Sequence, residues 1–234
     1  MINTNNNEIL NLAIKNNNIE IVELLLKDND LNINFQDDKG YTALILACIE
    51  NNVKIVKLLL ECGNINVNIK SNNEYINKNT ALLIAINKGN VEIIKLLLEN
   101  KNINVNLRDD DSNWALMHAL NYNDIEIVKL LLENKDVDIN LQTNNGNTVL
   151  MQACKNKNIK IIKLLLQCKN IKLFIQNDIK DNAFCYANKY ITKLLEEYKN
   201  NKEQITSKNN IIDIYITQEM IDNKQFTLNF IIKE

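Results

Sequence analysis

The feature that most limits how this chain can fold is an internal repeat with a period of about 34 residues, a length typical of repeat proteins. The segments that start at residues 41, 79 and 147 align without gaps, and each reaches the run Lys-Leu-Leu-Leu at the same offset. One alanine marks each unit, and the spacing is constant except for a longer third unit: Ala13, Ala47, Ala85, Ala119, Ala153 and Ala187. Such self-similarity predicts a solenoid, in which each unit buries its apolar face against its neighbours.

Six units account for an array over residues 1–198, with a tail at residues 199–234. The first and last units match the others least, as expected of ends that face solvent on one side. The predicted unit boundaries are 3–36, 37–70, 71–108, 109–142, 143–176 and 177–198. The tail is predicted to be a polar linker followed by two strand-like runs, IIDIYIT and FTLNFII, for which a terminal β-hairpin is one interpretation.

Each unit is predicted to hold a short first helix, a tight turn and a longer second helix. Thr42 lies where the first helix needs an N-cap, because its hydroxyl can accept an otherwise unpaired backbone N–H. Asn51 is placed to end that helix in the left-handed conformation, and Gly89 and Asn123 occupy the same register. Gly40 is expected to adopt a positive φ in the turn before the first helix.

The second helix is predicted to bury Ile55, Leu58 and Leu59, which recur at helical spacing. By the same register, Leu130 is predicted to be buried between neighbouring units. The segments that follow the second helices alternate polar and apolar residues with a period of two at 64–69, 102–107 and 136–141, which predicts extended connectors. Connectors of about 14 residues are too long for an all-helical array whose helices are joined only by tight turns.

Composition and charge narrow the class of protein further. The formal net charge is −2 and the pI is about 5.6, so there is no overall basic field to attract a nucleic acid, and nucleic acid is an unlikely partner. No apolar run is long enough to span a membrane, and the first residues lack the pattern of a secretory signal. We therefore expect a cytoplasmic protein without a membrane partner. The enrichment in Asn, Ile and Lys is interpreted as the codon bias of an AT-rich genome.

The sequence resembles the ankyrin repeat family. The motifs that carry the resemblance are GYTALILA at 40–47, KNTALLIA at 78–85, GNTVLMQA at 146–153 and the IVKLLLE segments at 55 and 127. The resemblance implies an all-α ankyrin-repeat solenoid with extended finger connectors. It also implies a non-catalytic protein-protein interaction module, an adaptor or an inhibitor, that binds its partner with the finger tips and with the first helices that line a concave groove. A purely structural repeat protein is the remaining alternative within this fold.

Motifs for catalysis are lacking. The single histidine, His118, has no paired nucleophile in the pattern and is assigned a packing or solvated role, and HExxH, GxSxG and Gly-rich phosphate loops do not occur. Five cysteines without a CxxC pair are interpreted as reduced structural thiols. We expect no enzyme activity, no cofactor, no metal and no small-molecule substrate, and we expect the chain to be a monomer.

A ladder of lysines recurs at one register of the second helices, and three of the four are followed four residues later by glutamate. The lysines are Lys57, Lys95, Lys129 and Lys163, and the following residues are Glu61, Glu99, Glu133 and Gln167. A solvated outer face with local ion pairs is one interpretation. The alternative is a nucleic-acid or anionic-surface binder that uses this ladder.

Aromatic and acidic residues gather at the finger and first-helix positions of consecutive units. Tyrosine and tryptophan are frequent in binding hot spots because they bury a large area at low entropic cost. The sequence therefore predicts a groove with aromatic anchors and an acidic rim that prefers a basic protein partner. For Trp114, packing between repeats is the alternative. The predicted binding residues are Tyr41, Tyr75, Trp114, Tyr122, Asp38, Glu74, Asp110 and Asp111.

Overall fold

The structure is a computed structural model, and it describes residues 6–72 and 78–202. Among the described residues up to 186, the α-helices come in five pairs, with a short turn inside each pair. A single 3₁₀ turn follows the fifth pair. These elements are α1 (Asn6–Lys15), α2 (Ile19–Leu25), α3 (Ala43–Ile49), α4 (Val53–Leu60), α5 (Ala81–Lys88), α6 (Val91–Glu99), α7 (Ala115–Asn121), α8 (Ile125–Leu132), α9 (Val149–Lys155), α10 (Ile159–Leu166) and η1 (Ala183–Tyr186). The described residues contain no β-strand and only an isolated bridge between Gln142 and Thr148. The all-α prediction is therefore confirmed.

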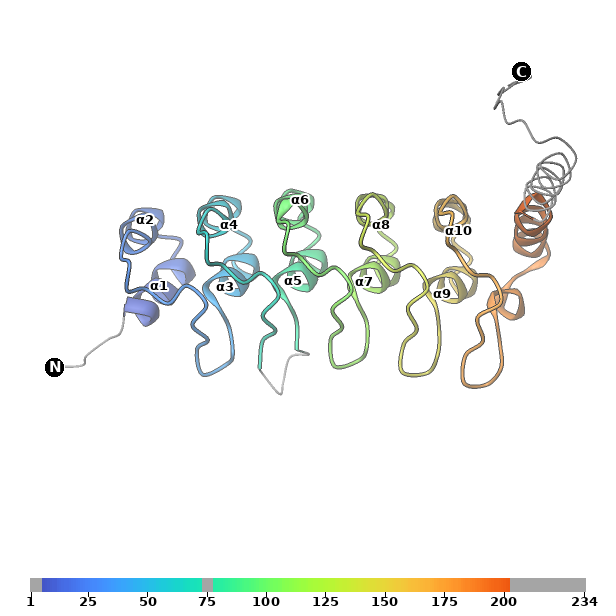
Figure 1. Cartoon of the computed structure of the whole chain (residues 1–234), viewed down its shortest axis with the longest axis horizontal. Coiled ribbons are helices and arrows are strands. Elements are labelled where there is room, and N and C mark those ends of the chain that lie inside the picture. The colour runs from blue at the N-terminus through green and yellow to red at the C-terminus, as the bar shows by residue number, and fades with distance from the viewer. Residues whose placement is uncertain (1–5, 73–77, 203–234) are drawn as a thin grey trace, which may run out of the picture. The chain divides into compact units, whose positions relative to one another are not determined.

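The chain divides into two compact units, Met1–Tyr186 and Ala187–Glu234. In the first unit, the odd-numbered helices form one row, the even-numbered helices form a second row, and the long loops project beyond the odd-numbered row (Figure 1). Each odd-numbered helix from α1 to α9 packs on the even-numbered helix of its pair, and neighbouring odd-numbered helices pack on one another. In the second unit, residues 189–202 are helical, so the helix continues four residues into the stretch predicted as a linker. The predicted hairpin lies outside the described residues.

Side-chain caps begin most of the helices. Thr42 Oγ1 accepts the backbone N–H of Ile45 at 3.2 Å, which confirms the predicted cap of α3. The same bond recurs in α5 and α9, from Thr80 and Thr148. Each second helix begins instead with an Asn or Asp side chain that accepts the N–H three residues on, from Asn18, Asn52, Asn90, Asp124 and Asn158.

The turn inside each pair uses a left-handed residue, as predicted. Asn51, Gly89 and Asn123 have φ values of 57°, 68° and 59°. Asparagine and glycine tolerate this conformation best, although Lys157 adopts it as well, with φ at 54°. The chain therefore reverses at the same place in each of these units.

The core is formed by apolar residues of both rows of helices and of the connectors. In α4 the completely buried residues are Ile55, Val56 and Leu59, whereas Leu58 is half-buried. Leu130 is likewise half-buried, and the next residue, Leu131, is completely buried. The predicted burial of Ile55 and Leu59 is therefore confirmed, whereas the prediction for Leu58 was wrong. The prediction for Leu130 was wrong by one position, because Leu131 takes the place in the core.

Asparagines hold each connector to the next. Asn34 donates its amide to the carbonyl of Asn64 at 2.8 Å and accepts the N–H of Asn66 at 2.8 Å. Asn68, Asn106 and Asn140 make the same two bonds with the connectors that follow them. We call these four residues the asparagine ladder. Each of these asparagines pairs with one N–H group and one carbonyl of the neighbouring connector. The asparagines at this register therefore have a structural role in addition to the codon bias inferred from composition.

Candidate functional site

Finger turns precede the first helices, and one residue at the base of each turn organises it. Asp37 accepts the backbone N–H groups of Lys39 and Tyr41 at 3.0 and 2.9 Å. Thr143, in a later unit, accepts the N–H of Asn147 in the same way at 3.2 Å. The confirmed positive φ of Gly40, 70°, closes the first of these turns. The side chains at the tips are thus held on short, hydrogen-bonded loops.

The acidic residues predicted for the rim lie at these tips. Asp38, Asp110 and Asp111 are all exposed. The Asp110 carboxylate lies 3.7 Å from the Lys78 ammonium group, and both side chains are half exposed, so this ion pair is solvated and weak. Glu74 and Tyr75, predicted at the longest finger, lie outside the described residues.

Two of the predicted aromatic anchors are buried. Trp114 has no exposed surface, and Tyr41 is only 8% exposed. Trp114 stands at the N-cap position of α7, where α3, α5 and α9 have threonine, and it makes no side-chain cap bond. Its ring lies 5.6 Å from the Arg108 guanidinium carbon. The prediction that Trp114 and Tyr41 anchor a partner was therefore wrong, and both are packing residues. For Trp114, packing between repeats was the alternative interpretation.

Among the described residues, Tyr122 is the predicted aromatic anchor that is exposed. It is 58% exposed at the C-terminal end of α7. Its ring stacks on that of His118, with centroids 6.4 Å apart and an interplanar angle of 26°. An exposed tyrosine that is supported from one side offers a large contact area at a small entropic cost.

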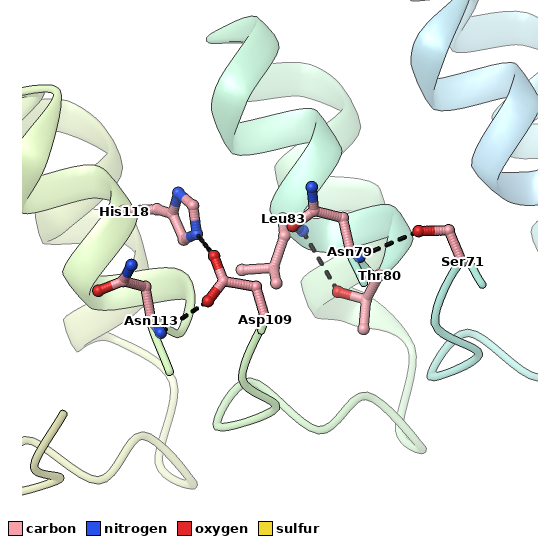
Figure 2. Close-up of polar contacts among 7 residues, drawn as sticks. All are labelled: Ser71, Asn79, Thr80, Leu83, Asp109, Asn113 and His118. Atoms are coloured by element: carbon pink, nitrogen blue, oxygen red, sulfur yellow. Dashed lines mark hydrogen bonds and ion pairs between the residues drawn. The ribbon is translucent and has the colours of Figure 1, made fainter. Parts of the chain in front are cut away.

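Sequence reasoning missed the bond that holds His118. Its Nε2 lies 2.8 Å from Oδ2 of Asp109, whose side chain is only 1% exposed (Figure 2). The other carboxylate oxygen accepts the N–H of Asn113 at 2.8 Å. Because a carboxylate accepts, Nε2 carries the hydrogen in this pair, and the second ring nitrogen points away from Asp109 in Figure 2. The pair fixes the tautomer and the orientation of the imidazole under Tyr122.

Register could have revealed this pair. Asp109 stands at the finger-base register of Asp37 and Thr143, and His118 directly precedes a marker alanine. The equivalent residues one unit after Thr143 are Asn177 and Tyr186, and they are also bonded, with the Asn177 amide 2.9 Å from the tyrosine hydroxyl. Polar residues at both positions therefore permit a bond between finger and helix but do not ensure one, because Thr143 and Gln152 at the same two positions are not bonded to each other in the described structure.

Cysteines are free in the described residues. Burial raises the pKa of the Cys48 and Cys154 thiols to about 12. Burial also raises the pKa of the Cys62 and Cys168 thiols. The negative charge of Glu61 raises the pKa of Cys62 further, by less than burial does. These thiols are poor nucleophiles at neutral pH, which agrees with the structural role predicted for them.

Two further searches cover only the residues that the structure describes. No group of three or more His, Cys, Asp or Glu side chains is placed to hold a metal ion there. No helix among them is long and apolar enough to cross a membrane.

The lysine ladder is exposed, but the ion pairs expected along it do not form among the described residues. Lys57, Lys95, Lys129 and Lys163 are all solvent-exposed. The ion pair that does form on this side joins neighbouring helices, from Lys54 of α4 to Glu23 of α2 at 3.5 Å. The ladder is therefore a row of solvated charges.

Comparison with known proteins identifies relatives of this architecture. The family model described as "Ankyrin repeats (3 copies)" matches residues 1–71, 65–143 and 116–209. No curated protein matches the chain. Among solved structures, the ankyrin repeat protein EF0377 is 27% identical, with a TM-score of 0.72 over 83% of this chain and 100% of that one.

Two other solved structures share the fold. The ankyrin repeat domain of Bcl-3, described as a unique member of the IkappaB protein family, is 24% identical, with a TM-score of 0.69 over 78% of each chain. An ankyrin repeat domain from Acinetobacter baumannii AYE is 24% identical, with a TM-score of 0.67 over 76% of this chain and 88% of that one.

Proposed function

Because the chain belongs to the ankyrin repeat family, whose repeats generally serve protein interaction, we propose that it is a non-catalytic adaptor or inhibitor that binds a protein partner. The partner lies along the finger turns and the first helices. Its binding segment is basic.

The observation that carries this proposal is the exposed Tyr122 on its supporting pair. His118 stacks against one side of the tyrosine, and buried Asp109 holds His118 in place. A side chain that is already ordered loses little entropy when a partner covers it, so more of its contact energy contributes to affinity. This is the arrangement of a binding anchor.

Charge supports a basic partner. Asp110 and Asp111 are exposed at the finger tip of the same unit, and Asp38 is exposed two units earlier. The segment 109–142 contains eight acidic residues against two lysines. Such a field speeds the approach of a positively charged segment and disfavours an anionic one, including a nucleic acid.

A pull-down from source-cell lysate with the full chain tests the proposal. Wild type is compared with Tyr122→Ala and with the double variant D110N/D111N, and bound proteins are quantified by mass spectrometry. We expect both variants to lose at least tenfold of the same basic partner. Tyr190→Ala, which changes a tyrosine that is 53% exposed elsewhere, is the matched control and should retain it. Equal retention by all variants would reject this surface as the binding site.

A further inference from the structure

Charge is distributed very unevenly between two consecutive segments of the array. Residues 143–176 contain six lysines and no acidic residue, in a chain whose formal net charge is −2. The preceding segment, 109–142, contains eight acidic residues and two lysines. All six lysines of the later segment are exposed: Lys155, Lys157, Lys160, Lys163, Lys169 and Lys172.

An open cavity of about 570 Å³ lies between α8 and α10, on the side of the lysine ladder. Apolar side chains from α8, from α10 and from the connector after α8 line part of it: Leu132, Val137, Ile139 and Leu164. Three lysines line it as well, Lys129, Lys135 and Lys169, together with one acidic residue, Glu133. The cavity therefore combines an apolar lining with an excess of positive charge.

This excess arises because acidic positions of one unit are neutral or basic in the next. Three positions in the connector after the second helix of segment 109–142 are acidic. The equivalent positions in the following unit carry no negative charge. The pairs are Glu133 and Gln167, Asp136 and Asn170, and Asp138 and Lys172. The positive charge is thus particular to this part of the array rather than a property of every repeat.

We propose that the cavity between α8 and α10 binds an acidic peptide segment of a protein partner. One apolar side chain of the peptide enters the apolar lining, and flanking Asp or Glu carboxylates pair with Lys129, Lys135 and Lys169. The proposal goes beyond the function proposed above, which concerns a basic partner on the finger side. The two surfaces differ in charge and in the helices that form them.

The lining favours a peptide over a nucleic acid. Proteins that hold single-stranded nucleic acid combine positive charge with aromatic side chains on which bases stack. No aromatic side chain among the described residues lines this cavity. An aliphatic lining with a charged rim instead suits an aliphatic peptide side chain between carboxylates, because apolar burial supplies affinity and the charges select the partner.

Selection from a displayed library of random 12-residue peptides on the full-length protein tests the proposal. Recovered peptides are synthesised and titrated against wild type, against K129Q/K135Q/K169Q and against the control K57Q/K95Q/K101Q. The control removes three other exposed lysines, from α4, from α6 and from the turn after α6. We expect peptides enriched in Asp or Glu around one Leu or Ile. Their affinity should fall at least tenfold in the cavity variant and less than twofold in the control.

Changes in the peptide keep the test independent of protein folding. Replacing the central Leu or Ile of a recovered peptide by Ser should weaken binding at least fivefold, and raising the salt concentration should weaken it further. The proposal is overturned if the selection yields no acidic peptides, or if the cavity variant and the control bind them equally. It is also overturned if a 20-nucleotide oligo-dT or vesicles with anionic lipid displace the peptide and bind more tightly than it does.

Discussion

Segments 109–142 and 143–176 have the same arrangement of helices and opposite charge. In both, a first helix of seven residues and a second helix of eight pack on their neighbours, and both finger turns close on a base residue. The acidic and basic residues that distinguish the segments lie almost entirely on the surface. The repeat geometry is therefore set by buried and hydrogen-bonding positions, which leaves the surface free to acquire two different electrostatic characters.

The interiors of the two segments also differ at several buried positions, among them the start of the first helix. Thr148 caps α9 by accepting the N–H of Met151 at 3.3 Å. Trp114 stands at the same register in the acidic segment and fills the interior instead, with its Nε1 buried and unpaired among the described residues. One segment is stabilised there by a hydrogen bond and the other by apolar burial.

The largest expected effect on stability comes from comparing substitutions at Trp114 and Thr148. Trp114→Ala should lower the free energy of unfolding by about 3–5 kcal/mol, because it leaves a cavity in the core. Thr148→Ala should lower it by about 1 kcal/mol, because one cap bond is lost. Urea unfolding followed by circular dichroism measures both. Trp114→Phe keeps most of the burial and should cost much less than the alanine variant, and a similar loss in both Trp114 variants would contradict a packing role.

Leucine triplets allow the shared interior to be tested in both segments. Leu131→Ala and Leu165→Ala should each cost about 2–5 kcal/mol, since both side chains have no exposed surface. Leu130→Ala, at a half-buried position, should cost less than about 1.5 kcal/mol. The measurement is again the urea midpoint of each variant. A larger loss at Leu130 than at Leu131 would restore the register predicted from sequence.

A double-mutant cycle tests the bond between finger and helix that the acidic segment makes and the basic segment lacks. Asp109→Ala and His118→Ala, alone and together, should show a coupling energy of about 0.5–3 kcal/mol. Thr143 and Gln152 occupy the same two positions in the basic segment, without a hydrogen bond between them in the described structure. Their cycle should therefore show coupling of less than about 0.5 kcal/mol. Equal coupling in the two cycles would mean that the contact between Asp109 and His118 contributes nothing specific.

The smallest expected difference between the two segments concerns the asparagine ladder. Asn106 holds the connector of the acidic segment and Asn140 that of the basic one, each through two hydrogen bonds. Asn106→Ala and Asn140→Ala should each lower the free energy of unfolding by about 1–2 kcal/mol. Aspartate at either position would place a carboxylate oxygen against the backbone carbonyl that the amide now contacts, so it should cost at least as much as alanine. Losses that differ by more than about 1 kcal/mol would show that surface charge affects the connectors after all.

Local signals in the sequence predicted the fold well. Thr42 and Asn51 could be assigned because a cap and a left-handed turn depend on residues close by in the chain. The burial of Tyr41, in contrast, could not be predicted, because its place in a finger turn favours exposure and the burial of a side chain depends on tertiary packing. The same holds for Leu58, which was predicted to be buried together with Leu59 but is only half-buried, because burial depends on how the surrounding helices pack.

The site was predictable only in part for the same reason. Exposure of Asp38 and Asp110 followed from their place at the finger tips. The bond between Asp109 and His118 depends on how a finger folds back on its own first helix, and the sequence pattern of a single unit does not state that distance.

By itself the sequence determined the repeat, its period and its helices, because these depend on spacing and on interactions within a few residues. Only the tertiary structure decided which aromatic residues are buried, which histidine contact forms and where lysines from neighbouring units line one cavity. Those outcomes depend on side chains that meet across units, and their distances are set by the packing of one repeat on the next.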